Sequence, residues 1–178
     1  MIVAWWYGGF AVAAGLLAAA GGLKLVRPAP TARAMASVGL PSRLALVRAA
    51  SAAEVVAGTG ALWWPSRPMA GVVALSYAGF AAFVVLARAR GGTVSSCGCF
   101  GETDAAPTVL HVVLDLAAAG FAMVAVVRPP WSLGRIIGGD PVPAIVLLVL
   151  VALGGYLAFL AMSVLPRTSA AAVSWRRP

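Results

Sequence analysis

The sequence predicts an all-α integral membrane protein, folded as a compact bundle of five transmembrane helices. Hydrophobic residues make up 62% of its 178 residues and charged residues only 10%, whereas a soluble domain carries about 25% charged residues. The mean hydropathy is +0.97. Several apolar runs also reach the roughly 20 residues that a helix needs to cross a bilayer.

The apolar runs are separated by short segments that are rich in proline, glycine or arginine. Proline and glycine interrupt helices, so each such segment predicts a boundary between two spans. A short interfacial helix over Thr31 to Val38 is expected inside the first connector, and Arg67 is expected in a very short turn. The predicted spans are residues 3–23, 44–64, 69–86, 107–127 and 143–165.

The chain accordingly divides into a membrane domain and a C-terminal extension. Four helices are expected to form the core of the bundle, and the last span adds a fifth. Pro107 is predicted at the start of the fourth helix, where the missing N–H of proline costs nothing. The expected parts are a four-helix domain at 1–127 with a cysteine loop at 91–106, a loop at 128–142, a fifth helix at 143–165 and a basic tail at 166–178.

The net charge of +8 does not indicate nucleic-acid binding, because the basic residues flank apolar runs and form no stripe with aromatic side chains. Positively charged residues prefer the cytoplasmic side of a membrane. If the N-terminus lies outside, ten cations fall inside and three, Arg67, Arg128 and Arg135, fall outside. We therefore predict a multi-pass protein of the bacterial inner membrane, with the cysteine loop and the C-terminus in the cytoplasm.

Cys97 and Cys99 are the only two cysteines, and Gly98 alone separates them. Cα atoms two positions apart lie roughly 5.5–7 Å from each other, which overlaps the range that a disulfide bridges. Such a small ring is strained, and strained disulfides are easily reduced. The pair therefore predicts a redox-active thiol couple, with two small packing residues as the structural alternative.

Four polar residues are expected near the cysteines, within or beside the inner half of the membrane. Lys24 ends the first span and Glu54 lies within the second, so these two are predicted to join in an intramembrane polar cluster, with Arg48 as another partner for Glu54. His111 and Asp115 are four residues apart and share a helix face. They are candidates for tuning a cysteine thiolate, because a nearby base raises the reactivity of a thiol.

A metal site is the competing chemistry at these residues. Cys97, Cys99 and His111 are soft ligands, and an aspartate could supply a fourth. Structural zinc normally uses two spaced pairs of ligands, which a single Cys-x-Cys with one histidine does not provide. We therefore expect no metal.

Several short motifs resemble the methylamine-utilisation protein E (MauE) family within the wider DoxX-like group. The most specific motif is Cys-Gly-Cys-Phe-Gly at 97–101. The family also has a glycine-to-lysine ending of its first helix, here Gly-Gly-Leu-Lys-Leu at 21–25, and a glutamate followed by glycine in its second helix, here at 53–58. Pro107-Thr108 and the later Asp115 are similar to its fourth helix, although Leu114 replaces a basic residue that relatives carry.

The resemblance implies a membrane protein that helps to process, transport or mature the disulfide-rich beta subunit of methylamine dehydrogenase. It implies a thioredoxin-like partner and a disulfide-containing client, with Cys97 and Cys99 as a thiol–disulfide oxidoreductase pair. Two alternatives stay open. One is a non-enzymatic assembly or scaffold protein, and the other is a quinone-coupled thiol oxidoreductase with a quinone cofactor near Glu54.

Overall fold

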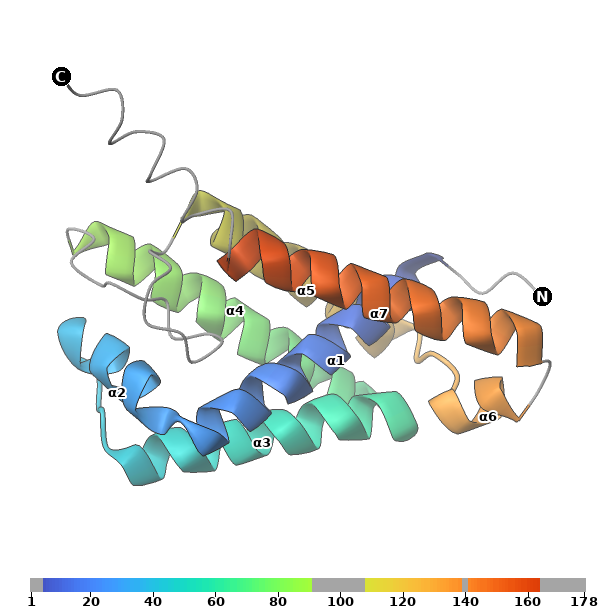
Figure 1. Ribbon diagram of the computed structural model, residues 1–178, viewed down its shortest axis with the longest axis horizontal. Helices are drawn as coiled ribbons and strands as arrows, with labels where there is room; N and C mark the ends of the chain where they lie inside the picture. The colour runs from blue at the N-terminus through green and yellow to red at the C-terminus, as the bar shows by residue number, and fades with distance from the viewer. Residues whose placement is uncertain (1–4, 91–107, 139–140, 164–178) are drawn as a thin grey trace, which may run out of the picture.

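The computed structural model describes residues 5–90, 108–138 and 141–163, and all regular structure in these ranges is helical (Figure 1). Cys97, Cys99 and the rest of the predicted cysteine loop lie outside the described residues, as does Pro107. The helices are α1 (Trp5–Val26), α2 (Pro28–Ser37), α3 (Leu44–Trp63), α4 (Arg67–Ala89), α5 (Val109–Val127), α6 (Leu133–Ile137) and α7 (Pro141–Ser163).

Four of the described helices, α1, α3, α4 and α5, are long and apolar enough to cross a membrane. They pack side by side, with α1 mainly against α3 and α4 mainly against α5 (Figure 1). This arrangement confirms the predicted all-helical membrane fold. Helix α7 lies against α1 and α5, and its longest apolar stretch, Leu148–Ala161, is shorter than the other spans. Its assignment as a fifth span therefore stays a prediction.

The helix boundaries differ from the predicted ones in three connectors. Helix α2 begins at Pro28, ahead of the predicted Thr31, because proline is well suited to the first turn of a helix. Arg67 is the first residue of α4 and does not lie in a turn, since the Ser66 side chain accepts a hydrogen bond from the Met69 N–H. Inside the predicted loop 128–142, Ser132 caps the short helix α6 in the same way.

Glycine allows α1 and α3 to approach each other closely. A Cβ atom added at Gly58 would lie 2.5 Å from the Ala14 carbonyl oxygen, and one at Gly21 would lie 2.8 Å from the Ser51 carbonyl oxygen. Small residues at helix interfaces in membranes bring backbones together and increase van der Waals contact. A side chain larger than hydrogen at either glycine would force these two spans apart.

The centre of the bundle is filled by aromatic and aliphatic side chains between many alanines. Phe10 and Leu17 of α1 and Val73 of α4 are fully buried. The Tyr77 hydroxyl donates a hydrogen bond to the Ala13 carbonyl oxygen at 2.7 Å. This bond joins α4 to α1 across the core, where no water is present to compete for the carbonyl group.

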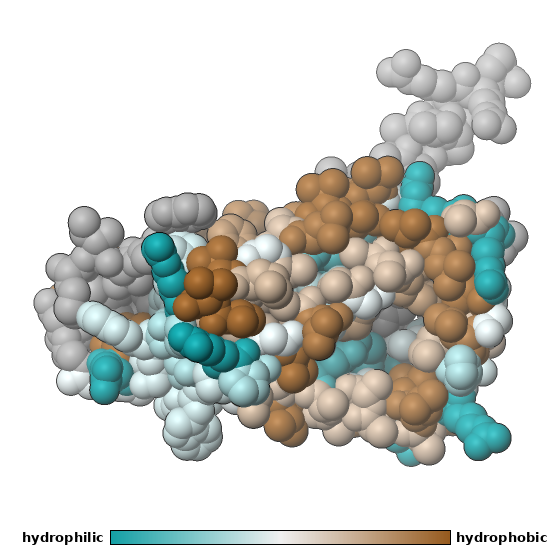
Figure 2. All heavy atoms as spheres, turned by 180° about the vertical axis from the view of Figure 1, so that it is seen from behind, coloured by the Kyte–Doolittle hydropathy of each residue, from teal (hydrophilic) through white to brown (hydrophobic). Residues whose placement is uncertain are grey.

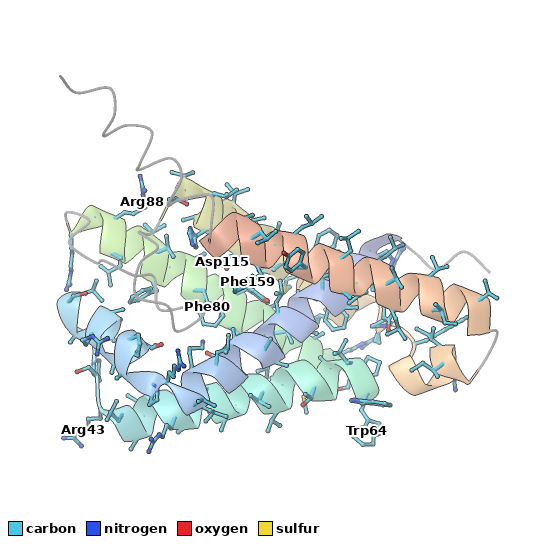
Figure 3. All side chains as sticks on the ribbon, viewed as in Figure 1. Arg43, Trp64, Phe80, Arg88, Asp115 and Phe159 are labelled. Atoms are coloured by element: carbon cyan, nitrogen blue, oxygen red, sulfur yellow. The ribbon has the colours of Figure 1, made fainter. Side chains whose placement is uncertain are left out.

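Charged and aromatic residues mark the two ends of the bundle. Arg43 lies at the start of α3, near α2, and Trp64 lies at its opposite end (Figure 3). Hydrophilic residues gather mostly toward the two ends, with apolar side chains between them (Figure 2). This banded surface is the pattern expected of a protein that spans a bilayer, with tryptophan at the membrane–water boundary. Which end faces the cytoplasm stays a prediction.

The glycine contact predicts that Gly58→Ala destabilises the protein. The added methyl group must displace the α1 backbone, and overpacking of this kind typically costs about 1–3 kcal/mol. Gly8→Ala is the matched control, because nothing lies within 4 Å of a Cβ at Gly8 in the same bundle. Unfolding of both variants in detergent micelles measures the difference. Equal stabilities would contradict the close approach of α1 and α3.

Candidate functional site

A buried ion pair joins α1 to α3 at the end of the bundle near α2. Lys24 lies in the last turn of α1, and Glu54 lies about 15 Å along α3 from its start, at 1.5 Å per residue. The Lys24 Nζ atom is 2.5 Å from Glu54 Oε2, and the two side chains are 4% and 12% exposed. Of the two predicted partners of Glu54, the structure thus selects Lys24.

Phe80 of α4 completes the surroundings of the lysine. The Lys24 Nζ atom lies 4.6 Å from the centre of the Phe80 ring, a cation–π distance. The same ring meets Tyr77 edge to face, at 5.7 Å between ring centres. Three spans therefore meet at the ammonium group: α1 provides it, α3 neutralises it and α4 covers it with an aromatic face.

A cavity of about 260 Å³ opens beside this ion pair, between α1, α2, α3 and α4. We call it the ion-pair cavity. The polar residues in its wall include Lys24, Ser51 and Glu54, and its aromatic residues are Phe80 and Phe83. Ser51 is one turn from Glu54 on α3, is 1% exposed and donates its hydroxyl hydrogen to the Val47 carbonyl oxygen at 2.7 Å.

The start of α5 holds the other predicted polar pair. His111 is fully buried, and Asp115, one turn later, is 3% exposed. Figure 3 labels Asp115 on α5. The Thr108 N–H donates to Nδ1 of His111 at 3.3 Å, and Thr108 Oγ1 lies 2.8 Å from the same nitrogen. This is the reciprocal contact of a capping box, with histidine in the position usually held by glutamate or glutamine.

The cap assigns a structural role to one nitrogen of His111. Because Nδ1 accepts the Thr108 N–H, its lone pair is engaged and a neutral ring carries its proton on Nε2. Proton transfer from a thiol to Nδ1 of His111 would then require the cap to open. The roles of His111 and Asp115 in tuning a thiolate stay predictions.

The two ends that flank the cysteine segment are described, although the segment is not. Arg90 ends α4 and donates from Nη1 to the Val38 carbonyl oxygen at the end of α2. Thr108 precedes α5, and Figure 1 shows that α4 ends and α5 begins toward the same end of the bundle. Among the described residues, no three His, Cys, Asp or Glu side chains gather in a way that could hold a metal ion.

Sequence reasoning missed Ser51 and Phe80 as members of the site. Ser51 was detectable in principle, because it precedes Glu54 by three residues and so shares its helix face. The Thr108–His111 cap also follows a known spacing, but with a histidine that the usual capping pattern does not include. Phe80 carries no local signal, since its position over Lys24 depends on how α4 crosses α1.

These features define a multi-pass helical membrane protein with a charged pair buried between its spans. The chain belongs to the MauE family: the family model described as methylamine utilisation protein MauE matches residues 1–132. The matched region ends just before α6 and so contains the four candidate spans and both cysteines. Searches of curated proteins and of solved structures found no match. The predicted family is thereby confirmed, and the wider DoxX-like likeness stays a prediction.

The buried ion pair predicts a strong energetic coupling between Lys24 and Glu54. Removing one partner leaves an uncompensated charge, so Lys24→Met or Glu54→Leu alone should destabilise the fold by about 3–5 kcal/mol. The double variant should recover much of this loss, because it buries no charge. Unfolding of the four proteins in detergent completes the double-mutant cycle. Additive losses would show that the two side chains do not interact.

Proposed function

We propose that this MauE-family protein is a membrane-embedded thiol–disulfide maturation protein. In this proposal Cys97 and Cys99 exchange disulfides with a thioredoxin-like partner and with a disulfide-containing client, such as the beta subunit of methylamine dehydrogenase. The observation that carries it is the position of the cysteines: the only two in the chain lie one residue apart, inside the region that matches the family.

The proposed chemistry is a two-step exchange. A thiolate of the pair attacks a disulfide sulfur of the partner, so that a mixed disulfide forms and the partner's other sulfur leaves as a thiolate. The second cysteine then attacks the mixed disulfide and releases the partner. The pair ends as a disulfide, oxidised by two electrons, and the partner ends as a dithiol, reduced by two. The reverse sequence passes the disulfide on.

The described residues support a fixed attachment for the segment that carries the pair. Arg90, directly before it, is bonded to the end of α2, and Thr108, directly after it, is held by His111. Both anchors lie at helix ends, so the bundle holds the residues that flank the segment on each side. Arg88 and Arg90 also place positive charge at the helix end that precedes the segment, and the proposal expects a cation near the pair because cations favour a thiolate.

The proposal predicts that a single cysteine variant traps its partner. With Cys99→Ser or Cys97→Ser, the mixed disulfide cannot be resolved and should accumulate as a covalent complex with a thioredoxin-like protein. Non-reducing electrophoresis and mass spectrometry identify the complex, and the Cys97→Ser/Cys99→Ser double variant is the control that forms none. If the double variant still supports client maturation, the chain is an assembly scaffold and not a thiol oxidoreductase.

Substitution of His111 separates its cap from a chemical role. His111→Gln retains an acceptor for the Thr108 N–H, whereas His111→Leu loses it and should cost about 1 kcal/mol of stability. If His111 also acts on a thiol, the glutamine variant should be as stable as the wild type but exchange disulfides about a hundredfold more slowly. Unfolding in detergent and the rate of partner oxidation measure the two effects. An unchanged rate in the glutamine variant would restrict His111 to the cap.

A further inference from the structure

The ion-pair cavity has the chemistry of a binding site for a neutral polar ring. Its volume of about 260 Å³ is small. It lies just below the range for ligand pockets, which begins at about 300 Å³. Its wall is mostly apolar, with the Lys24–Glu54 pair, Ser51 and Thr31 as polar groups within it. A site of this kind selects a compact ligand with a few polar atoms.

The charge balance of the wall disfavours an anion. The ammonium group of Lys24 is already neutralised by the Glu54 carboxylate at 2.5 Å, so the pair carries no net charge. A phosphate or carboxylate entering the cavity would leave water and would meet a carboxylate at close range, without a cation to itself. A neutral ligand that carries hydrogen-bonding oxygens avoids this cost.

The pair also presents a donor and an acceptor side by side. An ammonium group has three N–H donors, and a carboxylate has two acceptor oxygens, so one ion-pair contact leaves hydrogen-bonding capacity on each residue. The Ser51 oxygen, whose hydrogen points to Val47, adds a further acceptor. A ring carbonyl can accept from Lys24, and a ring hydroxyl can donate to Glu54 or Ser51. Both redox forms of a quinone, the dione and the diol, match this arrangement.

Access to the cavity lies between the end of α2 and the first turn of α3. Leu40 and Leu46 line the cavity and are 37% and 48% exposed on the protein surface. Met35 of α2 and Phe83 of α4 add further apolar surface to the wall. Leu46 lies in the first turn of the candidate span Leu44–Trp63, so this apolar rim begins at the expected membrane boundary, where a lipid-soluble ligand can enter.

We propose that the ion-pair cavity binds the headgroup of a membrane quinone, with a ring carbonyl hydrogen-bonded to Lys24 and the ring beside Phe80 and Phe83. The isoprenoid tail leaves past Leu46 into the lipid. This site goes beyond the proposed function and does not require the cysteine pair. A phospholipid headgroup is the competing occupant, and its negative charge is the property that distinguishes it.

Binding of decylubiquinone to the full-length protein in nanodiscs that contain no quinone tests the proposal. Isothermal titration should show one saturable site. Lys24→Met, which removes the N–H donor to the ring carbonyl, and Ala50→Phe, which fills the cavity from a surface-exposed position, should each weaken binding about tenfold or more, equivalent to roughly 1.4 kcal/mol. Thermal unfolding of both variants checks that they remain folded.

Two control variants test whether the quinone binds in this cavity and independently of the cysteines. Leu75→Phe adds an aromatic ring at an exposed position of α4 that does not line the cavity, and it should leave binding unchanged. The Cys97→Ser/Cys99→Ser variant should also bind normally, which separates a failure of this proposal from a failure of the thiol exchange. Absence of saturable binding, equal binding by Ala50→Phe, or displacement of the quinone by added phosphatidylglycerol would overturn the assignment.

Discussion

The contact between Lys24 and Glu54 determines how this bundle is organised at one end. A charge inside a bilayer is costly unless it is paired. The position of α1 against α3 must therefore keep the Lys24 ammonium group in contact with the Glu54 carboxylate. Gly21 and Gly58 permit the necessary approach, since neither position has space for a Cβ. Phe80 then covers the ammonium group from α4. Electrostatics and small-residue packing thus select the same arrangement of three spans.

Most of the fold could be predicted from the sequence, because spans in a bilayer are defined by long apolar runs between charged and proline-rich connectors. The residues at which helices start were harder to predict, since Ser66 and Ser132 act through caps that composition does not reveal. Lys24 and Arg48 were both expected as partners of Glu54, and only the structure distinguishes between them. The place of Phe80 depends on tertiary packing and could not be inferred from any local pattern.

The segment proposed for thiol exchange and the cavity proposed for ligand binding are connected through Arg90 and α2. Helix α4 ends and α5 begins toward the same end of the bundle (Figure 1), and the ion-pair cavity lies between α1, α2, α3 and α4. Arg90 links the two regions, because it precedes the cysteine segment and is bonded to the end of α2. In the two proposals, the residue that precedes the segment with the redox pair thus also contacts the helix that lines the ligand site.

The ionisation state of Glu54 tests the central claim most directly. An infrared difference spectrum between the wild type and Glu54→Gln isolates the bands of this one carboxyl group. The ion pair predicts a carboxylate stretch in the wild type that shifts in Lys24→Met, because the ammonium group no longer contacts the carboxylate oxygens. A protonated Glu54 in the wild type, or a spectrum that does not respond to Lys24→Met, would contradict the ion pair on which the arrangement of these spans depends.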